Sequence, residues 1–185
     1  MGLRNTPDSF GSVARALHWL MFILLVAALV IGNYAASIPV GSVEKTQIRW
    51  YHESIGLTIL LLLVSRLFWR LCNPGVQPVG ISRPRMLMSR FIHGLLYVLM
   101  FLQSITGLVM VQAYGYPTTF FGLFTVPTLV PVDEGIGLVV GVAHGLLWVF
   151  LVFAASIHML AALYHHFILG DGTLMRMLTG KSPES

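Results

Sequence analysis

The stretch "HGLLWVFLVFAASIHMLAALYHH", residues 144 to 166, decides the fold. A transmembrane helix needs about 20 predominantly apolar residues, and this segment is long and apolar enough to supply them. It nevertheless carries four histidines, at positions 144, 158, 165 and 166. Ionisable side chains inside a membrane are costly, so they usually face the interior of a helix bundle and have a function there.

The composition of the whole chain indicates that the bilayer is its solvent. Of the 185 residues, 56% are hydrophobic and only 10% are charged, whereas soluble domains carry roughly 25% charged residues. The formal net charge of +4 is spread over the ends of the apolar segments, so no nucleic-acid-binding patch is indicated. The single cysteine, Cys72, excludes an internal disulfide and a Cys-x-x-Cys-His haem attachment motif.

Four apolar segments predict an all-α membrane protein, a bundle of four transmembrane helices. They are residues 16–36, 50–71, 91–113 and 138–169. Long unbroken apolar runs favour helices over membrane strands, which alternate and are about half as long. No internal repeat is visible, and the whole chain, 1–185, is predicted to be a single transmembrane domain. The connection at 114–135 is aromatic but broken by prolines, and it is predicted to lie at the interface as a lid.

The distribution of lysine and arginine predicts the orientation, because cytoplasmic loops carry an excess of both. Only Lys45 and Arg49 fall on one side of the predicted topology. The other side has the remaining nine: Arg4, Arg15, Arg66, Arg70, Arg83, Arg85, Arg90, Arg176 and Lys181. Both termini are therefore predicted to be cytoplasmic.

The last segment offers two imidazoles on one face. His158 follows His144 by 14 residues, which is roughly 21 Å along a helix and within about 40° of the same direction. His165 continues almost the same stripe. The predicted topology gives each level a partner: His52 for His144 at the outer level, and either His18 or His93 for His158 at the inner level.

Two facing imidazoles in a helix bundle suit a haem bound by two histidines. Two such levels predict two stacked haems and a path for electrons across the bilayer. Zinc prefers four ligands, which neither level supplies. A proton relay usually includes Asp or Glu, and the spans have almost none. Any one histidine could instead hydrogen-bond a neighbour, and for His93 and His166 this interpretation stays open. Glycines leave room beside the helix backbone, which suits either haem binding or close packing of the helices. They are Gly32, Gly56, Gly107, Gly141 and Gly145.

Several fragments resemble the bacterial cytochrome b561 family over nearly the whole chain. They are "ARALHWLMF", "YHESIGLTILLLLVSRLFWRL", "HGLLYVLMF", "ITGLVMV" and "HMLAALYHHF". The resemblance implies a multi-pass cytochrome of the bacterial inner membrane with two b-type haems. It also implies the axial ligands: His18 with His158 for the inner haem iron, and His52 with His144 for the outer one. His93 matches a family position but receives no axial role.

The resemblance also suggests where electrons enter and leave, because one branch of the family is a superoxide oxidase that reduces ubiquinone. His165 lies past the inner haem, and it is a candidate to hydrogen-bond or protonate ubiquinone, since histidine titrates near neutral pH. Arg66, Trp69 and Arg70 are expected at a similar depth; an aromatic belt with a positive anchor is the alternative. On the outer face Arg49, between Lys45 and His52, is a candidate for anion entry or for a haem propionate.

The sequence predicts an oxidoreductase, and two interpretations of its role are open. The first is a stand-alone enzyme that oxidises superoxide, or accepts electrons from another periplasmic partner, and reduces ubiquinone within the lipid. The alternative is an anchor and electron-carrier subunit of a larger respiratory dehydrogenase, as in membrane formate dehydrogenases and hydrogenases. Four compact spans with short tails favour the first. A metal or proton transporter is a third, non-redox interpretation.

Overall fold

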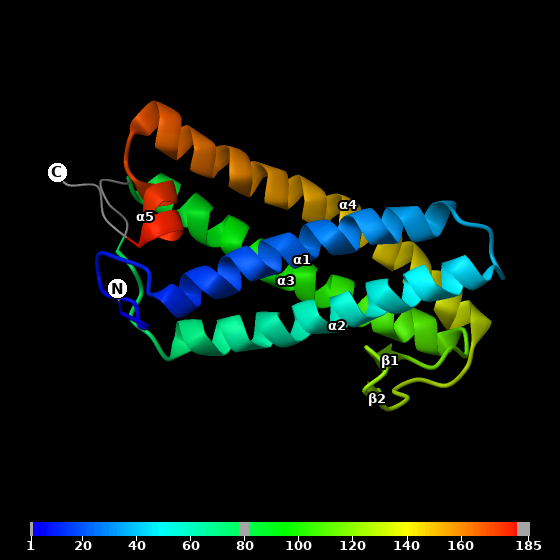
Figure 1. Cartoon of the computed structure of the whole chain (residues 1–185). Coiled ribbons are helices and arrows are strands. Elements are labelled where there is room, and N and C mark those ends of the chain that lie inside the picture. The colour runs from blue at the N-terminus through cyan, green and yellow to red at the C-terminus, as the bar shows by residue number, and fades with distance from the viewer. Residues whose placement is uncertain (1, 78–81, 181–185) are drawn as a thin grey trace.

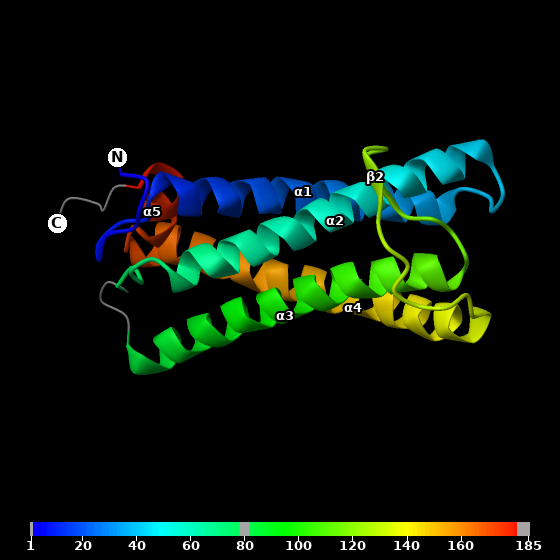
Figure 2. The same ribbon diagram turned by 90° about the horizontal axis from the view of Figure 1, so that it is seen from below.

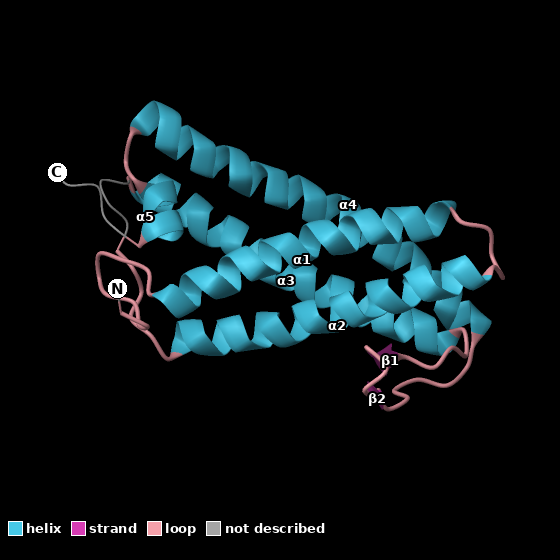
Figure 3. Ribbon diagram, viewed as in Figure 1, coloured by secondary structure: helices cyan, strands magenta, loops and turns pink. Residues whose placement is uncertain are grey.

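The computed structural model describes residues 2–77 and 82–180, which are largely helical (Figure 3). Within this described part of the chain, four helices are long and apolar enough to cross a membrane, which confirms the predicted fold class. Lys181, one of the predicted cytoplasmic charges, lies outside the described residues. The elements are α1 (Ser12–Ser37), α2 (Val43–Leu71), α3 (Arg83–Ala113), β1 (Thr119–Phe120), β2 (Phe124–Thr125), α4 (Glu134–Tyr164), the π-helix η1 (His165–Leu169) and α5 (Thr173–Thr179).

The four long helices begin earlier than the apolar segments at 16–36, 50–71, 91–113 and 138–169, and α4 reaches residue 169 only together with η1. Two of the starts have a side-chain cap. The Ser42 hydroxyl accepts a hydrogen bond from the Lys45 backbone N–H, and an Asp133 carboxylate oxygen accepts one from Ile136. Helix α3 begins with a proline in its first turn, where the missing N–H has no cost. The helices therefore extend beyond the apolar segments at their N-terminal ends.

The helices form two antiparallel pairs. Helix α1 packs along α2 and α3 packs along α4, and the pairs meet where α2 contacts α3 (Figures 1 and 2). The described N-terminal segment before α1 and helix α5 lie together at one end of the bundle, here called the terminal end. The β1–β2 hairpin lies toward the opposite end, here called the hairpin end. Each of the four long helices therefore extends between the terminal end and the hairpin end.

Most apolar side chains of the bundle face outward. In the most hydrophobic window of each long helix, only 6% to 17% of the residues are buried within the chain. Side chains such as Val30, Phe68, Phe153 and Ile168 are more than half exposed. Such an arrangement would be unstable in water, but lipid tails are as apolar as these side chains. The bundle is therefore built for hydrocarbon on its outer surface.

The interior between the helices contains a small apolar core. Leu99 of α3 packs with Leu151 and Ala154 of α4, and all three are at most 7% exposed. Leu151 is seven residues, about two helical turns, from both His144 and His158. The core therefore forms an apolar layer between the two histidine levels. The side chains packed around it are Leu25, Leu95, Leu96, Met100 and Leu147.

The connection from α3 to α4 folds back against α2. The Trp50 indole N–H donates to the Thr119 hydroxyl at 2.8 Å. Fully buried Ser54 donates to the Thr119 carbonyl at 3.3 Å and accepts from the Phe121 N–H at 3.1 Å. This packing agrees with the expectation of a lid over one end, while its depth in the membrane stays a prediction.

Helix α5 closes the terminal end. The Trp19 indole of α1 donates to the carbonyl of Met177, and Arg176 donates to the carbonyl of Gln77. Arg176 is only 4% exposed. It therefore joins α5 to the connection between α2 and α3, in addition to contributing positive charge at this end.

We expect Ser54→Ala to loosen the lid, because the Phe121 N–H would lose its acceptor inside the protein. An unsatisfied buried group costs about 1–3 kcal/mol. The variant should show a lower thermal midpoint and faster proteolysis within residues 114–133. Ser65→Ala is the matched control, since the Ser65 hydroxyl bonds only the preceding turn of its own helix. Equal behaviour of the two variants would contradict this role of Ser54.

Candidate functional site

Five histidines occupy the interior of the bundle at two levels. At the hairpin end, the rings of His52 and His144 lie 6.3 Å apart between centroids, at an interplanar angle of 88°. At the terminal end, His18 lies 6.1 Å from His158, and His93 lies 5.0 Å from the same ring. Each level thus links the α1–α2 pair to α4, which agrees with the depths inferred from the sequence.

The ring separations distinguish the histidines. Two imidazoles that bind one metal ion from opposite sides, each through a nitrogen at roughly 2 Å, hold their ring centres about 6 Å apart. His52–His144 and His18–His158 have this separation. His93 lies closer to His158 than two ligands on opposite sides of one ion would, and its Nδ1 contacts the Ser89 hydroxyl at 3.3 Å. Among residues 2–77 and 82–180, no three His, Cys, Asp or Glu side chains converge as a multidentate metal site would need.

At the hairpin end, hydrogen bonds fix both imidazoles in the tautomer that a metal ligand needs. His52 Nδ1 lies 3.0 Å from the Ala28 carbonyl, which can only accept, so Nδ1 carries the proton and Nε2 has a free lone pair. Thr106 donates its hydroxyl hydrogen to the preceding turn, and its oxygen accepts from His144 Nδ1 at 3.1 Å. His144 Nε2 then accepts from the Gln103 amide.

Two glycines bring helix backbone against these rings. A Cβ at Gly32 of α1 would lie 2.7 Å from His52 Cε1, and a Cβ at Gly107 of α3 would lie 3.0 Å from His144 Cε1. The two rings therefore have their present positions because these residues lack a side chain. By contrast, a Cβ at Gly56 or Gly145 would meet nothing within 4 Å.

The terminal-end pair has a different hydrogen-bonding state. The Arg66 guanidinium donates to His18 Nδ1 at 2.9 Å. Because a guanidinium can only donate, Nδ1 is the acceptor here and the proton lies on Nε2. Arg66 was expected at the lipid-accessible edge with Trp69 and Arg70, but it points into the histidine level instead.

The residues fit a haem that is held by two histidines at each level. Neutral imidazoles are its ligands in membrane cytochromes, and the spacing matches at both levels. At the hairpin end, the Nε2 lone pair of His52 is available, whereas the Gln103 amide would have to release His144 Nε2. At the terminal end, Arg66 would first have to release His18.

His165, the predicted quinone ligand, lies where helix α4 changes into the π-helix η1. Its Nδ1 contacts the carboxylate of Asp171, whose other oxygen accepts from the Thr173 N–H at 3.0 Å. Partial burial would raise the pKa of Asp171, but the hydrogen bonds from His165 and Thr173 outweigh it and hold that pKa below its ordinary value. The carboxylate therefore stays charged at neutral pH and can orient the imidazole.

Sequence reasoning missed Asp171 because it lies beyond the last apolar run. Its only signal was its position in "GDGT", where Gly170 and Gly172 adopt positive φ and turn the chain back toward His165. Arg70 has its guanidinium 5.8 Å from the ring centre of Tyr97. Within the described residues, the buried Trp69 indole N–H has no hydrogen-bond partner. Among the described residues, the side-chain contacts of His165 go to Asp171 and Tyr164 and not to Trp69 or Arg70.

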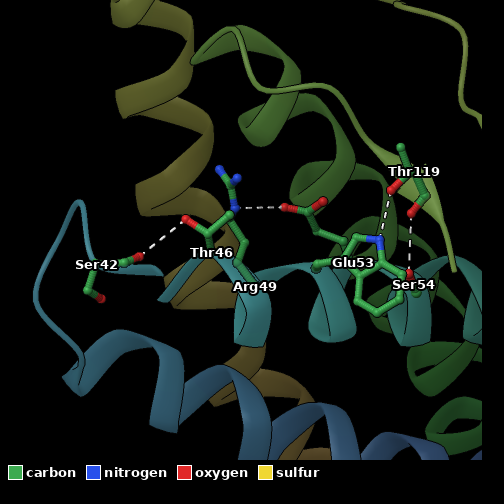
Figure 4. A network of polar contacts seen from close by, with 7 residues as sticks. Ser42, Thr46, Arg49, Glu53, Ser54 and Thr119 are labelled. Atoms are coloured by element: carbon green, nitrogen blue, oxygen red, sulfur yellow. Dashed lines mark hydrogen bonds and ion pairs between the residues drawn. The ribbon is translucent and has the colours of Figure 1, made fainter. Parts of the chain in front are cut away.

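A cavity of about 320 Å³ lies at the hairpin end between α2 and the lid. Figure 4 shows Arg49, Glu53 and Thr119 of its lining. Arg49 lines it, with its Nε 3.3 Å from Glu53 Oε1 and its guanidinium carbon 3.9 Å from the Tyr116 ring centre. Lys45 instead donates to the Ile38 carbonyl. Of the expected basic triplet, only Arg49 lines the cavity, and Glu53 balances its charge. The lining residues are Thr46, Gln47, Arg49, Trp50, Glu53, Pro117 and Thr119.

Comparison with known proteins gives a consistent result. The family model for prokaryotic cytochrome b561 matches residues 9–180. Cytochrome b561 homolog 2 of Escherichia coli (strain K12) is 33% identical over 183 residues, 98% of this chain and 97% of its own length. The probable superoxide oxidase CybB of Yersinia pestis is 28% identical over 89% of this chain and 93% of its own. Cytochrome b561 homolog 1 of E. coli is 26% identical over 92% and 97%, respectively.

We expect Gly32→Ala to displace the His52 ring, since the added Cβ would overlap it. The variant should therefore retain less haem than the unaltered protein when the absorbance of reduced haem is compared with the protein concentration. Gly56→Ala, on the same side of the membrane in the next helix, has open space and should retain the full amount. Equal haem content in the two variants would show that His52 has no role in binding it.

Proposed function

The chain belongs to the prokaryotic cytochrome b561 family of haem b-binding membrane electron-transfer proteins, and we propose that it oxidises superoxide and reduces ubiquinone. In this proposal His52 and His144 hold one haem, and His18 and His158 hold a second. The observation that carries the proposal is the occurrence of two imidazole pairs with the same ring separation, 6.3 and 6.1 Å, at opposite ends of one bundle.

Bound haem would supply one-electron transfer at each level. The protein's part is to orient the imidazoles and to exclude water. The Ala28 carbonyl and the Thr106 hydroxyl hold the Nδ1 protons of His52 and His144. The apolar layer around Leu151 separates the two levels. These contacts support electron transfer along the bundle without a polar channel.

We place the terminal end in the cytoplasm of a bacterium, with the bundle in the inner membrane. Arginines gather at this end, in the N-terminal segment and the start of α1, the end of α2, the start of α3, and α5. Helix orientation follows this kind of Lys and Arg excess. The hairpin end would then face the periplasm, where the cavity beside Arg49 would be accessible to a donor.

Superoxide as the donor is supported by the name of one relative, the probable superoxide oxidase of Yersinia pestis. The cavity supports it only in part. The guanidinium of Arg49 can attract an anion, but Glu53 lies within 3.3 Å of it and reduces the long-range field. Superoxide entry should consequently depend only weakly on ionic strength.

Ubiquinone as the acceptor is supported by the pair of His165 and Asp171 near the terminal end. Reduction of a quinone requires protons, and an imidazole oriented by a carboxylate is suited to deliver them. Asp171 stays ionised at neutral pH because its pKa is lowered. Its carboxylate, in contact with His165 Nδ1, can therefore hold the imidazole in one orientation beside the quinone.

The proposal predicts that the purified protein contains two haems per chain and that a pulse of superoxide reduces them. Added ubiquinone should reoxidise them, and superoxide dismutase should abolish the reduction. His144→Ala should lower the haem content toward one, because it removes one ligand of one pair. A colourless protein would contradict haem binding, whereas a coloured protein that ignores superoxide would point to another donor.

We expect His165→Ala to slow ubiquinone reduction by about tenfold or more, the usual range for loss of a proton donor. Reduction of the haems by superoxide should be unchanged, since His165 lies at the other end. Asp171→Asn should have a smaller effect in the same direction. His166→Ala is the neighbouring control and should behave like the unaltered protein. Unchanged quinone reduction in His165→Ala would exclude its role.

A further inference from the structure

The side chain of Arg66 carries a positive charge within the membrane-spanning helix α2, and no carboxylate of the described residues pairs with this charge. It is half-buried, and its described hydrogen bond goes to the neutral ring nitrogen of His18 at 2.9 Å. No carboxylate of the described residues pairs with it: Glu53 contacts Arg49, and Asp171 contacts His165. A charged side chain at such a position is costly unless it is paired. The Arg66 guanidinium therefore requires an anion that the described residues do not provide.

The contact with His18 is incompatible with metal binding by that histidine. If Nε2 of His18 binds iron, Nδ1 must carry the ring proton, and two donors would then face each other. If Nδ1 binds iron instead, the guanidinium occupies the position of the metal. Arg66 must therefore leave His18 in the haem-bound protein in either case. At the hairpin end the corresponding donor is neutral: the Gln103 amide lies 3.1 Å from His144 Nε2, so no unpaired charge accompanies that contact.

We propose that Arg66 binds a propionate carboxylate of the haem held by His18 and His158. This inference rests on the proposed function, since it assumes a haem at the terminal end. A propionate is the anion that the cofactor itself brings, and guanidinium and carboxylate form paired hydrogen bonds. A propionate would offer the guanidinium a charged acceptor in place of the neutral His18 Nδ1, which could then carry the ring proton.

This assignment gives the two haems different surroundings. Arg49, the arginine at the hairpin end, is already paired with Glu53. A nearby positive charge favours the reduced state of an iron centre, because reduction adds negative charge. Arg66 would accordingly raise the midpoint potential of the terminal-end haem. Electrons that enter at the hairpin end would then be drawn toward the terminal end.

The test uses the full-length protein with His144→Ala, so that only the terminal-end site binds haem. The cofactor-free chain is titrated with haem and with haem dimethyl ester, whose propionates carry no charge. Arg66→Gln should weaken haem binding by about tenfold or more, while it leaves the affinity for the ester nearly unchanged. Arg66→Lys should retain part of the preference for free haem. Arg85→Gln, which removes an equal charge from the exposed start of α3, should bind haem normally.

Equal weakening of both ligands by Arg66→Gln, or no weakening of either, would overturn the assignment. Redox titration of the two-haem protein provides a second measurement. Arg66→Gln should lower one midpoint potential and leave the other unchanged, and two unchanged potentials would also overturn it. A His144→Ala chain that binds neither compound would instead contradict the proposed terminal-end haem, so the two failures are distinguishable.

Discussion

An imidazole inside a lipid-embedded bundle has two ring nitrogens and no water to satisfy them. The arrangement of this protein follows from that constraint. His52 reaches the Ala28 carbonyl on the neighbouring helix, and His144 reaches Thr106. These contacts tie α2 to α1 and α4 to α3, in the same pairs that pack most closely. The polar requirement of the rings and the apolar packing of the helices therefore select the same neighbours.

The two levels differ in how far the chain prepares them for a cofactor. At the hairpin end, acceptors on the backbone and on threonine hold the Nδ1 protons, and glycines provide room for the rings. At the terminal end, a guanidinium holds His18 in the opposite tautomer. The two levels thus differ in the donor beside a histidine, which is the neutral amide of Gln103 at the hairpin end and the charged guanidinium of Arg66 at the terminal end. Such a difference is consistent with two sites that have the same ligands but different affinities and potentials.

The helices and the two histidine levels could be predicted from the sequence, because the apolar runs give the spans and the topology gives each histidine a depth. The 14-residue step from His144 to His158 predicted two levels, and the structure brings histidines together at both. The resemblance to a family, rather than the spacing, suggested His18 over His93 as a ligand, and that choice stays a prediction.

The hydrogen-bond partners of the histidines could not be predicted from the sequence by the same reasoning. The bond from Arg66 to His18 spans 48 positions along the chain, and that from His52 to Ala28 spans 24. The contact of Asp171 with His165 depends on two glycine turns and on a π-helical segment that apolar runs do not reveal. Periodicity describes one helix at a time, whereas these contacts depend on how separate helices, or turns after them, come together.

The apolar layer around Leu151 has a consequence for energy coupling. Residues 19–33, 54–65, 98–113 and 145–157 contain no Asp, Glu, His, Lys or Arg, so this middle zone has no side chain suited to passing protons. An electron that moves from the hairpin end to the terminal end would cross most of the bilayer without a compensating ion. Moving one elementary charge through the membrane costs about 2.3 kcal/mol per 100 mV. In a respiring cell with a negative interior, the membrane voltage would therefore oppose this electron movement and slow turnover. Loss of the voltage would remove that opposition.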